Sequence, residues 1–299
     1  MSDYHVPVLL QETLSHLIGD VNGLYMDMTF GGGGHSKAIL DKLGPKGDLV
    51  VFDQDVEAQN ELFEEERICF VKSNFRHVYR FWKWMNLEKV DGILADLGVS
   101  SHQFDVDYRG FSYRFDAPLD MRMNEDANAT AAHVLNTYDA RQLQDIFSRY
   151  GEIRNSRTLA KAIVDYRKNV KPIEGTFELN QLVNPLVFGD RIRYLSQLYQ
   201  ALRIEVNEEM DALADMLESA IRILKPGGKL VVISYHSLED RMVKRYLKSG
   251  NREGKVIKDD FGKPQVNIKQ LGKLILPTEE EQKINSRSRS AKMRVGQRI

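Results

Sequence analysis

Residues 24–35 read LYMDMTFGGGGH, an apolar run that leads directly into four consecutive glycines. The run from Leu24 to Met28 predicts a buried strand, and the glycines followed by His35 predict a tight turn into a helix. Glycine allows a ligand to approach the backbone because no Cβ stands in its way. Phosphate-binding and dinucleotide-binding sites share such turns, so this one indicates a nucleotide-like ligand without specifying which.

The rest of the chain repeats the alternation of strands and helices. Four further β-rich runs span residues 49–52, 68–71, 93–95 and 230–233. Such alternation predicts βαβ units with parallel strands and right-handed crossovers. We expect Ser36 and Ser237 to be the N-caps of the helices that follow the first and the last run. The predicted fold class is therefore α/β, with a Rossmann-like sheet.

A helical domain is predicted to interrupt this sheet. Residues 128–203 show helical periodicity without strand signals, whereas residues 1–127 and 204–299 carry the runs predicted as strands. We therefore expect a sheet domain built from the two outer segments and an inserted all-α domain, residues 128–203, for substrate recognition. Glycines and prolines become frequent between residues 249 and 282, which predicts a long surface excursion without an assigned role.

Charge restricts where a polyanion could bind. The chain has 42 basic and 43 acidic residues, a net charge of -1, so no overall field attracts nucleic acid and any such surface must be local. The last seventeen residues, from Lys283, contain six basic residues and no acidic one. This pattern favours contact with a polyanion. It equally fits a closing strand through Met293 and Val295 with a solvated basic face.

Composition also indicates a cellular location. The single cysteine, Cys69, cannot form an internal disulfide and suits a reducing compartment; its apolar neighbours predict that it lies in the core. The N-terminus lacks the pattern of a signal peptide, and the longest apolar runs are too short to span a bilayer. We expect a cytoplasmic protein that makes no membrane contact, and we identify no metal-binding residues.

Acidic residues distinguish between the candidate cofactors. Asp53, at the end of the second predicted strand, is placed to accept hydrogen bonds from both ribose hydroxyls of an adenosine ligand. NAD would require glycines spaced Gly-x-Gly-x-x-Gly, whereas this chain has four consecutive glycines that end in His35. The acidic Asp27 would repel a pyrophosphate and would favour the positively charged S-adenosylmethionine. Simpler roles stay open: Asp53 could only form a turn at the end of the strand, and His35 could only cap the helix. An NAD-binding enzyme also stays open as an alternative function.

The fourth predicted strand ends in Asp96, followed by Leu97-Gly98-Val99-Ser100-Ser101-His102-Gln103. Ligands of open α/β sheets bind at the carboxyl ends of the strands, which places this loop beside the cofactor. Many amino-group methyltransferases have Asp-Pro-Pro-Tyr at this point. Here Asp96 keeps the acid while Leu97-Gly98 replaces the prolines, so an exocyclic amine target is permitted but not required.

The whole chain resembles the bacterial 16S ribosomal RNA cytosine-N4 methyltransferase family, of the RsmH or MraW type. The motifs that carry the resemblance are His5 to Leu10 with Glu12, Gly33 to His35, Asp96 to Gln103, Arg109 to Ser112, Pro118 to Met123, Gln200 to Ile204 with Val206 and Asn207, His236 to Arg241, and Arg289 to Lys292 with Arg294 and Val295. Several motifs in one order are highly specific. Two departures stand out: residues 193–199 lack a basic run common in the family, and His102 replaces a common proline.

The resemblance implies transfer of a methyl group from S-adenosylmethionine to cytidine N4 in the decoding region of 16S ribosomal RNA. The partner would be this RNA within the small ribosomal subunit, and a homodimer is compatible with the resemblance. The implied cofactor contacts are Gly33, Gly34, His35, Asp53, Phe75, Asp96 and Gln103. The candidate RNA contacts are Arg203, Arg287, Arg289, Lys292 and Arg294.

The proposed chemistry is in-line attack by N4 on the sulfonium methyl, with the base held out of its stack. Asp96 is the first candidate for accepting an amine hydrogen. Asp120, Arg122 and His236 rank second, because an Asp120–Arg122 ion pair and a packing role for His236 explain them equally well. The alternative function is an RNA-binding scaffold of the same fold that has lost its chemistry.

Overall fold

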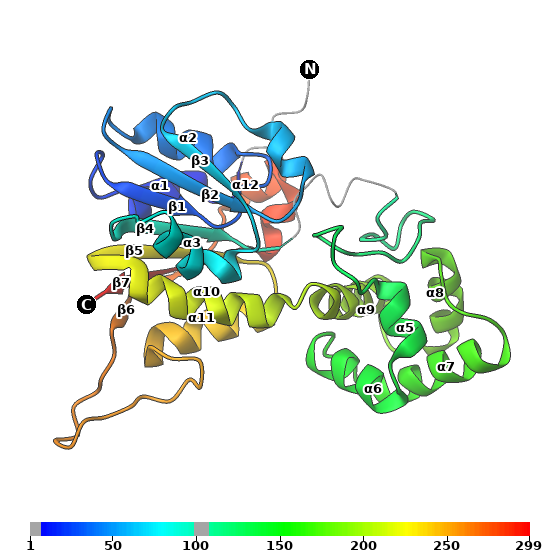
Figure 1. The fold of residues 1–299 in the computed structure, drawn as a ribbon. Coiled ribbons are helices and arrows are strands. Elements are labelled where there is room, and N and C mark those ends of the chain that lie inside the picture. The colour runs from blue at the N-terminus through cyan, green and yellow to red at the C-terminus, as the bar shows by residue number, and fades with distance from the viewer. Residues whose placement is uncertain (1–6, 99–107) are drawn as a thin grey trace. The chain divides into compact units, whose positions relative to one another are not determined.

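The computed structural model describes residues 7–98 and 108–299 (Figure 1). The predicted cofactor contact Gln103, together with the other loop residues 99–102, lies outside the described residues. The chain divides into two compact units. The first consists of Met1–Gly98 and Met210–Ile299, and the second of Val99–Glu209.

A seven-stranded sheet forms the centre of the first unit, in the order β3-β2-β1-β4-β5-β7-β6. Strands β1 to β5 are parallel, whereas β7 is antiparallel to both β5 and β6. All five runs predicted as strands fall on β1 to β5, which confirms the Rossmann-like α/β class. The strands are β1 Leu24–Asp27, β2 Asp48–Asp53, β3 Ile68–Lys72, β4 Val90–Asp96, β5 Leu224–Ser234, β6 Ile268–Ile275 and β7 Lys292–Arg298.

The strand order reverses beside β1. Strand β1 pairs with β2 on one side and with β4 on the other. In open parallel sheets, ligands bind outside the carboxyl ends of the strands at such a reversal. Asp27 is the last residue of β1 and Asp96 is the last residue of β4. The topology therefore brings these two acids to the position where a ligand is expected.

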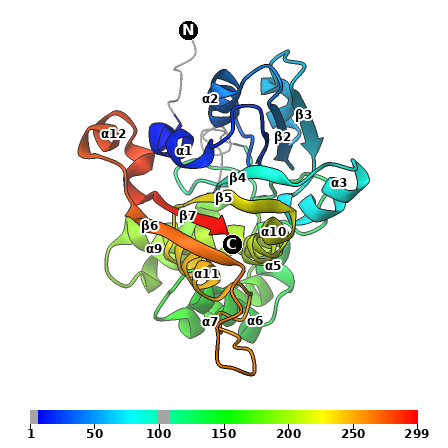
Figure 2. The same cartoon turned by 90° about the vertical axis from the view of Figure 1, so that its left-hand side faces the viewer.

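Helices cover both faces of the sheet (Figures 1 and 2). In β2, Leu49 and Val51 belong to the apolar cluster that includes α1 and α2, while Val50 and Phe52 belong to the cluster that includes α10 and α11. This alternation follows from the two-residue period of a strand. The helical elements of this unit are α1 Leu10–Leu17, α2 Gly34–Lys42, η1 Glu57–Glu61, η2 Phe75–His77, α3 Val78–Trp84, α10 Glu209–Ile223, α11 Ser237–Ser249, α12 Glu279–Ile284 and η4 Ser286–Ser290.

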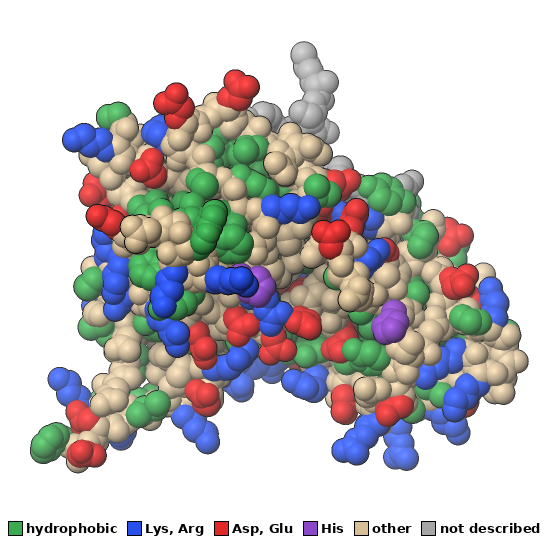
Figure 3. Space-filling view, viewed as in Figure 1, with side chains coloured by type: hydrophobic (Ala, Val, Ile, Leu, Met, Phe, Trp, Pro, Cys, Tyr) green, Lys and Arg blue, Asp and Glu red, His purple; other side chains and the backbone are tan. Residues whose placement is uncertain are grey.

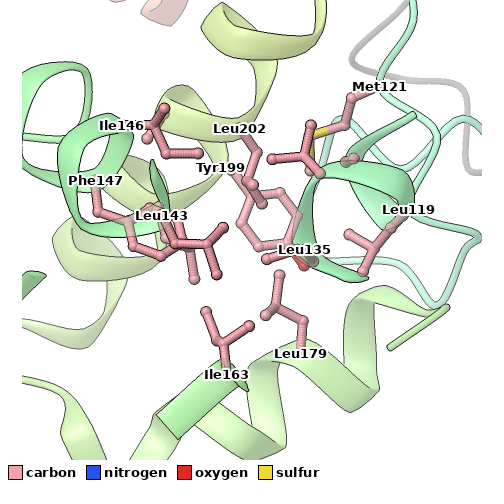
Figure 4. Close-up of a cluster of buried hydrophobic side chains, with 14 of the residues drawn as sticks. Leu119, Met121, Leu135, Leu143, Ile146, Phe147, Ile163, Leu179, Tyr199 and Leu202 are labelled. Atoms are coloured by element: carbon pink, nitrogen blue, oxygen red, sulfur yellow. The ribbon is translucent and has the colours of Figure 1, made fainter. Parts of the chain in front are cut away.

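The second unit is helical in its described part, and its apolar core is drawn in Figure 4. Its helices are α5 Ala131–Thr137, α6 Ala140–Arg149, α7 Ser156–Asn169, α8 Thr176–Val183, η3 Asn184–Leu186 and α9 Arg191–Val206. The unit extends beyond the insertion expected at 128–203. Leu119 and Met121 are buried in the core of the helices, and α9 continues to Val206, so these flanking segments pack with the helical unit.

Two predicted helix caps are wrong. Helix α2 is capped by Gly33 in a left-handed conformation, because the hydroxyl of Ser36 is instead bonded to the Asp27 carboxylate. Helix α11 is capped by His236, not Ser237: His236 and Glu239 form a reciprocal capping box. A left-handed glycine therefore begins α2 without a side-chain cap, whereas a pair of side-chain bonds fixes the start of α11.

Two further expectations need correction. Cys69 is exposed, because β3 is an edge strand whose alternate side chains face outward. The segment 249–282 is not an excursion throughout: it contains β6 and the start of α12. The closing strand through Met293 and Val295 is confirmed as β7. Across the described residues, every helix is too short or too polar to cross a bilayer.

Candidate active site

The glycine turn follows β1 and begins α2. Gly31 and Gly33 have φ of 51° and 72°, a region that favours glycine. A Cβ on Gly34 would lie 2.6 Å from Pro7 Cγ, and one on Gly33 would lie 2.9 Å from Phe30 Cζ, whereas a Cβ on Gly32 would meet open space. Gly33 and Gly34 are therefore required for packing within the protein itself, and the open side of the turn is at Gly32.

Asp27 lies beneath this turn and has no exposed surface. Its Oδ1 accepts hydrogen bonds from the backbone N–H of Thr29 at 3.0 Å and from the Thr29 hydroxyl at 3.3 Å. Its Oδ2 accepts from the Ser36 hydroxyl at 2.7 Å. Burial raises the pKa of Asp27 to about 6, although these hydrogen bonds and the nearby His35 oppose the rise.

Asp53 connects the end of β2 to the glycine turn. Its Oδ2 accepts a 2.8 Å hydrogen bond from Gly31 N–H, and its Oδ1 accepts a 2.9 Å bond from Asp55 N–H. Burial raises the pKa of Asp53, against the effect of these bonds. Each carboxylate oxygen has a second lone pair. A third backbone N–H, that of Gln54, also bonds to the carboxylate. Asp53 can therefore hold the turn and still has acceptor capacity for a neighbouring hydroxyl group.

Phe75 follows β3 at the start of η2. The ring is partly buried and packs against the apolar cluster beneath the sheet. Asn74 caps η2 through its side chain and donates a 2.9 Å hydrogen bond to Gln54 Oε1, which ties this turn to the residue after Asp53. Asp53 therefore ends β2, and Phe75 follows the neighbouring strand β3. The hydrogen bond between Asn74 and Gln54 joins the turns after these two strands.

Asp96 is contacted from two sides. Tyr235 Oη donates a 2.8 Å hydrogen bond to Asp96 Oδ1, and His35 Nδ1 lies 3.5 Å from Asp96 Oδ2. Asp96 N–H donates a 2.7 Å bond to the Thr29 hydroxyl, the same hydroxyl that reaches Asp27. Burial raises the pKa of Asp96 to about 7; the Tyr235 hydrogen bond lowers it and the charge of Glu239 raises it further.

The environment of His35 favours a protonated Asp96. His35 Nε2 lies 3.0 Å from the carbonyl oxygen of Val8, which can only accept, so Nε2 carries a proton. Burial lowers the pKa of His35, which favours the neutral ring. The remaining Nδ1 of a neutral ring then has only a lone pair toward Asp96 Oδ2. That lone pair disfavours a carboxylate and suits the protonated acid.

Tyr235 was not predicted from the sequence. It directly follows β5, which lies next to β4 in register with Asp96 opposite Ile233. Glu239 fixes the local backbone, because its Oε2 accepts hydrogen bonds from Tyr235 N–H at 2.9 Å and His236 N–H at 3.3 Å. Its position in the sequence could have revealed it. Tyr235 is a polar residue directly after the strand next to β4, so it lies at the same edge of the sheet as Asp96.

The second-rank candidates have structural partners. His236 caps α11, and its Nε2 lies 3.1 Å from Glu239 Oε1. In the helical unit, Asp120 and Arg122 form a two-bond ion pair at 2.7 and 2.8 Å, which confirms that the pair is present. Burial raises the pKa of Asp120, but the bonds from Arg122 outweigh it and hold that pKa below its usual value.

The predicted RNA contacts fall into two groups. Arg203 is bound to Glu209 by two hydrogen bonds at 2.7 and 2.9 Å. Arg294 is buried and pairs with Asp240 at 2.6 Å, so it contributes to the packing of β7 on α11. Lys292 is half-buried, whereas Arg287 and Arg289 are exposed on η4. Among the tail residues, Arg287 and Arg289 are therefore best placed to meet a polyanion.

The strand order reverses at β1, a glycine turn follows β1, and acids end β1, β2 and β4. These features define a Rossmann-like fold, the class in which nucleoside-containing ligands bind at such a reversal. The chain belongs to the MraW methylase family, which matches residues 2–299. It is therefore a member of a family of methyl-transferring enzymes.

Bacterial relatives match almost the full length of the chain. A Flavobacterium johnsoniae protein is 50% identical, covering 99% of this chain and 98% of the relative. A Parabacteroides distasonis protein is 50% identical, covering 100% and 98%. A Bacteroides fragilis protein is 51% identical, covering 99% and 97%. All three are named ribosomal RNA small subunit methyltransferase H.

Proposed function

We propose that this chain transfers a methyl group from S-adenosylmethionine to the exocyclic N4 amine of a cytidine in the decoding region of 16S ribosomal RNA. The observation that carries the proposal is the Asp96 carboxyl group, held at the end of β4 by Tyr235 and with a pKa of about 7. The names of relatives about 50% identical support small-subunit ribosomal RNA as the substrate. The family resemblance supports the N4 position.

The residues present fit S-adenosylmethionine. The remaining acceptor capacity of Asp53 suits the ribose hydroxyls, and the turn is open at Gly32. The buried carboxyl of Asp27 carries its charge more readily beside a cation than without one, because its pKa of about 6 reflects desolvation. When bound, the cofactor supplies an electrophilic methyl group on a positively charged sulfur. We propose that His35, Asp53, Phe75 and Asp96 hold it, with Gly33 and Gly34 shaping the turn.

Asp96 has the properties that the amine requires. The N4 lone pair of cytosine is delocalised into the ring, so an acceptor for an amine hydrogen makes nitrogen a better nucleophile. In its ionised form, Asp96 can accept that hydrogen at one carboxylate oxygen while Tyr235 Oη orients the other. With a pKa near 7, Asp96 gains and loses a proton readily at neutral pH. Tyr235 acts through Asp96 and is a positioning residue.

The remaining assignments concern the RNA and the setting of the reaction. We propose that Arg287 and Arg289 contact phosphates and that the helical unit contributes to recognition of the substrate. The site would act in the cytoplasm on RNA within the small ribosomal subunit. A homodimer is compatible with the family resemblance, and light scattering of the purified protein would test it.

The experiment incubates the purified protein with labelled S-adenosylmethionine and small ribosomal subunits from a strain that lacks this enzyme. Calorimetric titration with the cofactor runs in parallel. We expect binding of the cofactor and label on a single cytidine of the 16S RNA. Cofactor binding without label on any RNA would contradict the proposal, and absence of cofactor binding would favour an RNA-binding scaffold.

A further inference from the structure

A basic and aromatic surface covers α3, outside the site described above. Residues 72–90 contain five lysines and arginines but one acid, Glu88, in a chain whose net charge is -1. Figure 3 shows hydrophobic and basic side chains side by side in this region of the first unit. We define the α3 surface by Tyr79, Arg80, Lys83 and Trp84 of α3 and Arg222 of α10.

The cations of the α3 surface are not neutralised by carboxylates. Arg80, Lys83 and Arg222 are exposed, and within residues 7–98 and 108–299 none of them forms an ion pair. Asp215, an acid of the adjoining α10, is bound by Arg76 at 3.0 Å and by Arg252 at 3.2 Å. Three positive charges therefore face solvent without a carboxylate in ion-pair contact, although Glu218 lies one helical turn before Arg222 on α10.

Aromatic rings lie among these cations. Lys83 Nζ lies 4.9 Å from the centre of the Tyr79 ring, and Arg222 Cζ lies 5.5 Å from the same centre. The Tyr79 ring stacks on the Trp82 ring with 5.7 Å between their centres. The ring that the two cations contact is therefore itself held against the protein. Trp84 differs from these rings, because 79% of its surface is exposed. Its edge-to-face contact with Phe81, 6.4 Å between ring centres, leaves most of the indole in water, where a partner from outside the unit could cover it.

We propose that the α3 surface binds an unpaired segment of the ribosomal RNA substrate, with phosphates on Arg80, Lys83 and Arg222 and a base stacked on Trp84. The inference rests on the proposed function, which supplies an RNA substrate. Unpaired RNA presents both phosphates and free base faces, and single-strand binding surfaces combine cations with aromatic rings for that reason. A protein partner would have to bring carboxylates to meet all three cations, whereas single-stranded RNA offers a phosphate at every nucleotide together with a base to stack.

The two tryptophans of the chain, Trp82 and Trp84, both lie on α3, so tryptophan fluorescence, excited where tyrosine does not absorb, reports on this helix alone. In the Trp82→Phe variant, emission comes from Trp84. We expect small-subunit ribosomal RNA to quench that emission and to protect it from acrylamide. RNA binding measured by filter retention, with no change in Trp84 emission or accessibility, overturns the proposal.

Affinity measurements provide the second arm. In the variant Arg80→Ala/Lys83→Ala/Arg222→Ala, the slope of log K against log salt for RNA binding should become shallower by about 2. This is the change expected when three phosphate contacts to a single strand are lost. Trp84→Ala should weaken binding roughly 5- to 100-fold, and Trp84→Phe should retain most of it. Calorimetric affinity for S-adenosylmethionine should stay at the wild-type value.

The matched control replaces Lys255, Lys258 and Lys263, three exposed cations of the same unit, together with the exposed ring of Phe261. An equal loss of affinity in the control set overturns the proposal, because the effect would then come from net charge alone. The wild-type protein separates the two claims. If it methylates small subunits while the α3 variants bind RNA normally, only the α3 surface fails. If it neither binds nor methylates this RNA, both claims fail.

Discussion

Tyr235 directly follows β5 and Asp96 ends the adjacent parallel strand β4, and the 2.8 Å hydrogen bond from Tyr235 Oη to Asp96 Oδ1 joins the ends of the two strands. The hydroxyl stabilises the ionised carboxylate and so lowers the pKa of Asp96, against the larger raising effect of burial. The pair therefore determines the pH at which Asp96 becomes an acceptor.

The first prediction concerns this pair. For the wild type, kcat/KM should rise as pH increases through about 7 and should then level off, because ionised Asp96 is the active form. Tyr235→Phe removes a bond to the ionised form, so the rise should move to higher pH by roughly 0.5 to 1 pH unit. The control Tyr194→Phe removes the tyrosine bond to Asn155 in the helical unit. Identical profiles for the two variants would refute the positioning role.

The second prediction concerns Asp27. Its folded-state pKa of about 6 lies above its usual value of 3.8, so folding favours the protonated form. The associated stability is present below about pH 4 and is lost as pH rises through about 6. At pH 7.5, Asp27→Asn should raise the free energy of unfolding by about 1 to 3 kcal/mol and weaken S-adenosylmethionine binding. Urea unfolding at pH 4 and 7.5 tests this; an equal effect at both pH values would be incompatible with burial of a charge.

The third prediction tests the ribose assignment. Asp53→Ala should weaken S-adenosylmethionine binding by about 2 to 4 kcal/mol, since it removes charge-assisted hydrogen bonds to two hydroxyls. Asp53 also holds Gly31 N–H and Asp55 N–H, so the thermal midpoint of the variant is needed as a control for folding. Unchanged affinity by calorimetry in a folded variant would remove Asp53 from the cofactor site.

The sequence predicted the acids of this site but not all of their partners. Asp27, Asp53 and Asp96 were located from strand ends, because a parallel sheet brings the ends of its strands to one edge. Tyr235 belongs to the same edge, yet its contact with Asp96 depends on the turn that Glu239 holds after β5. Such a turn depends on side-chain bonds rather than on periodicity.

Helix starts and surface charges show the same limit. Ser36 was predicted as a cap from its residue type, but Asp27 binds its hydroxyl. Arg294 was grouped with the basic tail, but Asp240 pairs with it across a gap of 54 residues. The pattern of charges indicates a basic segment, and only the folded chain distinguishes the cations that remain exposed, such as Arg289, from those that are buried, such as Arg294.

The fourth prediction uses this difference between the arginines. Arg287→Ala/Arg289→Ala should lower RNA affinity and flatten its salt dependence without changing stability, because both side chains are exposed. Arg294→Ala should instead cost about 2 to 4 kcal/mol of unfolding free energy, because it leaves Asp240 in a largely buried position without its partner. Equal stability of the two variants in urea would show that the Arg294 pair contributes little.

The fifth prediction concerns the role of Asp96. Asp96→Ala should reduce turnover at saturating S-adenosylmethionine by roughly a hundredfold or more, the size expected for loss of a positioned acid or base. Asp96→Asn keeps an acceptor oxygen without the charge and should retain more activity than Asp96→Ala. If both variants matched the wild type, Asp96 would have no part in the chemistry.

The most direct test of the central claim is the identity of the methylated nucleoside. Labelled S-adenosylmethionine, the purified protein and small subunits from a strain lacking the enzyme are incubated together. The RNA is then digested and its nucleosides are separated and identified by mass spectrometry. We expect a single labelled product, N4-methylcytidine, which is strongly reduced with Asp96→Ala. Label on C5 of cytosine, on a ribose hydroxyl or on protein would contradict it.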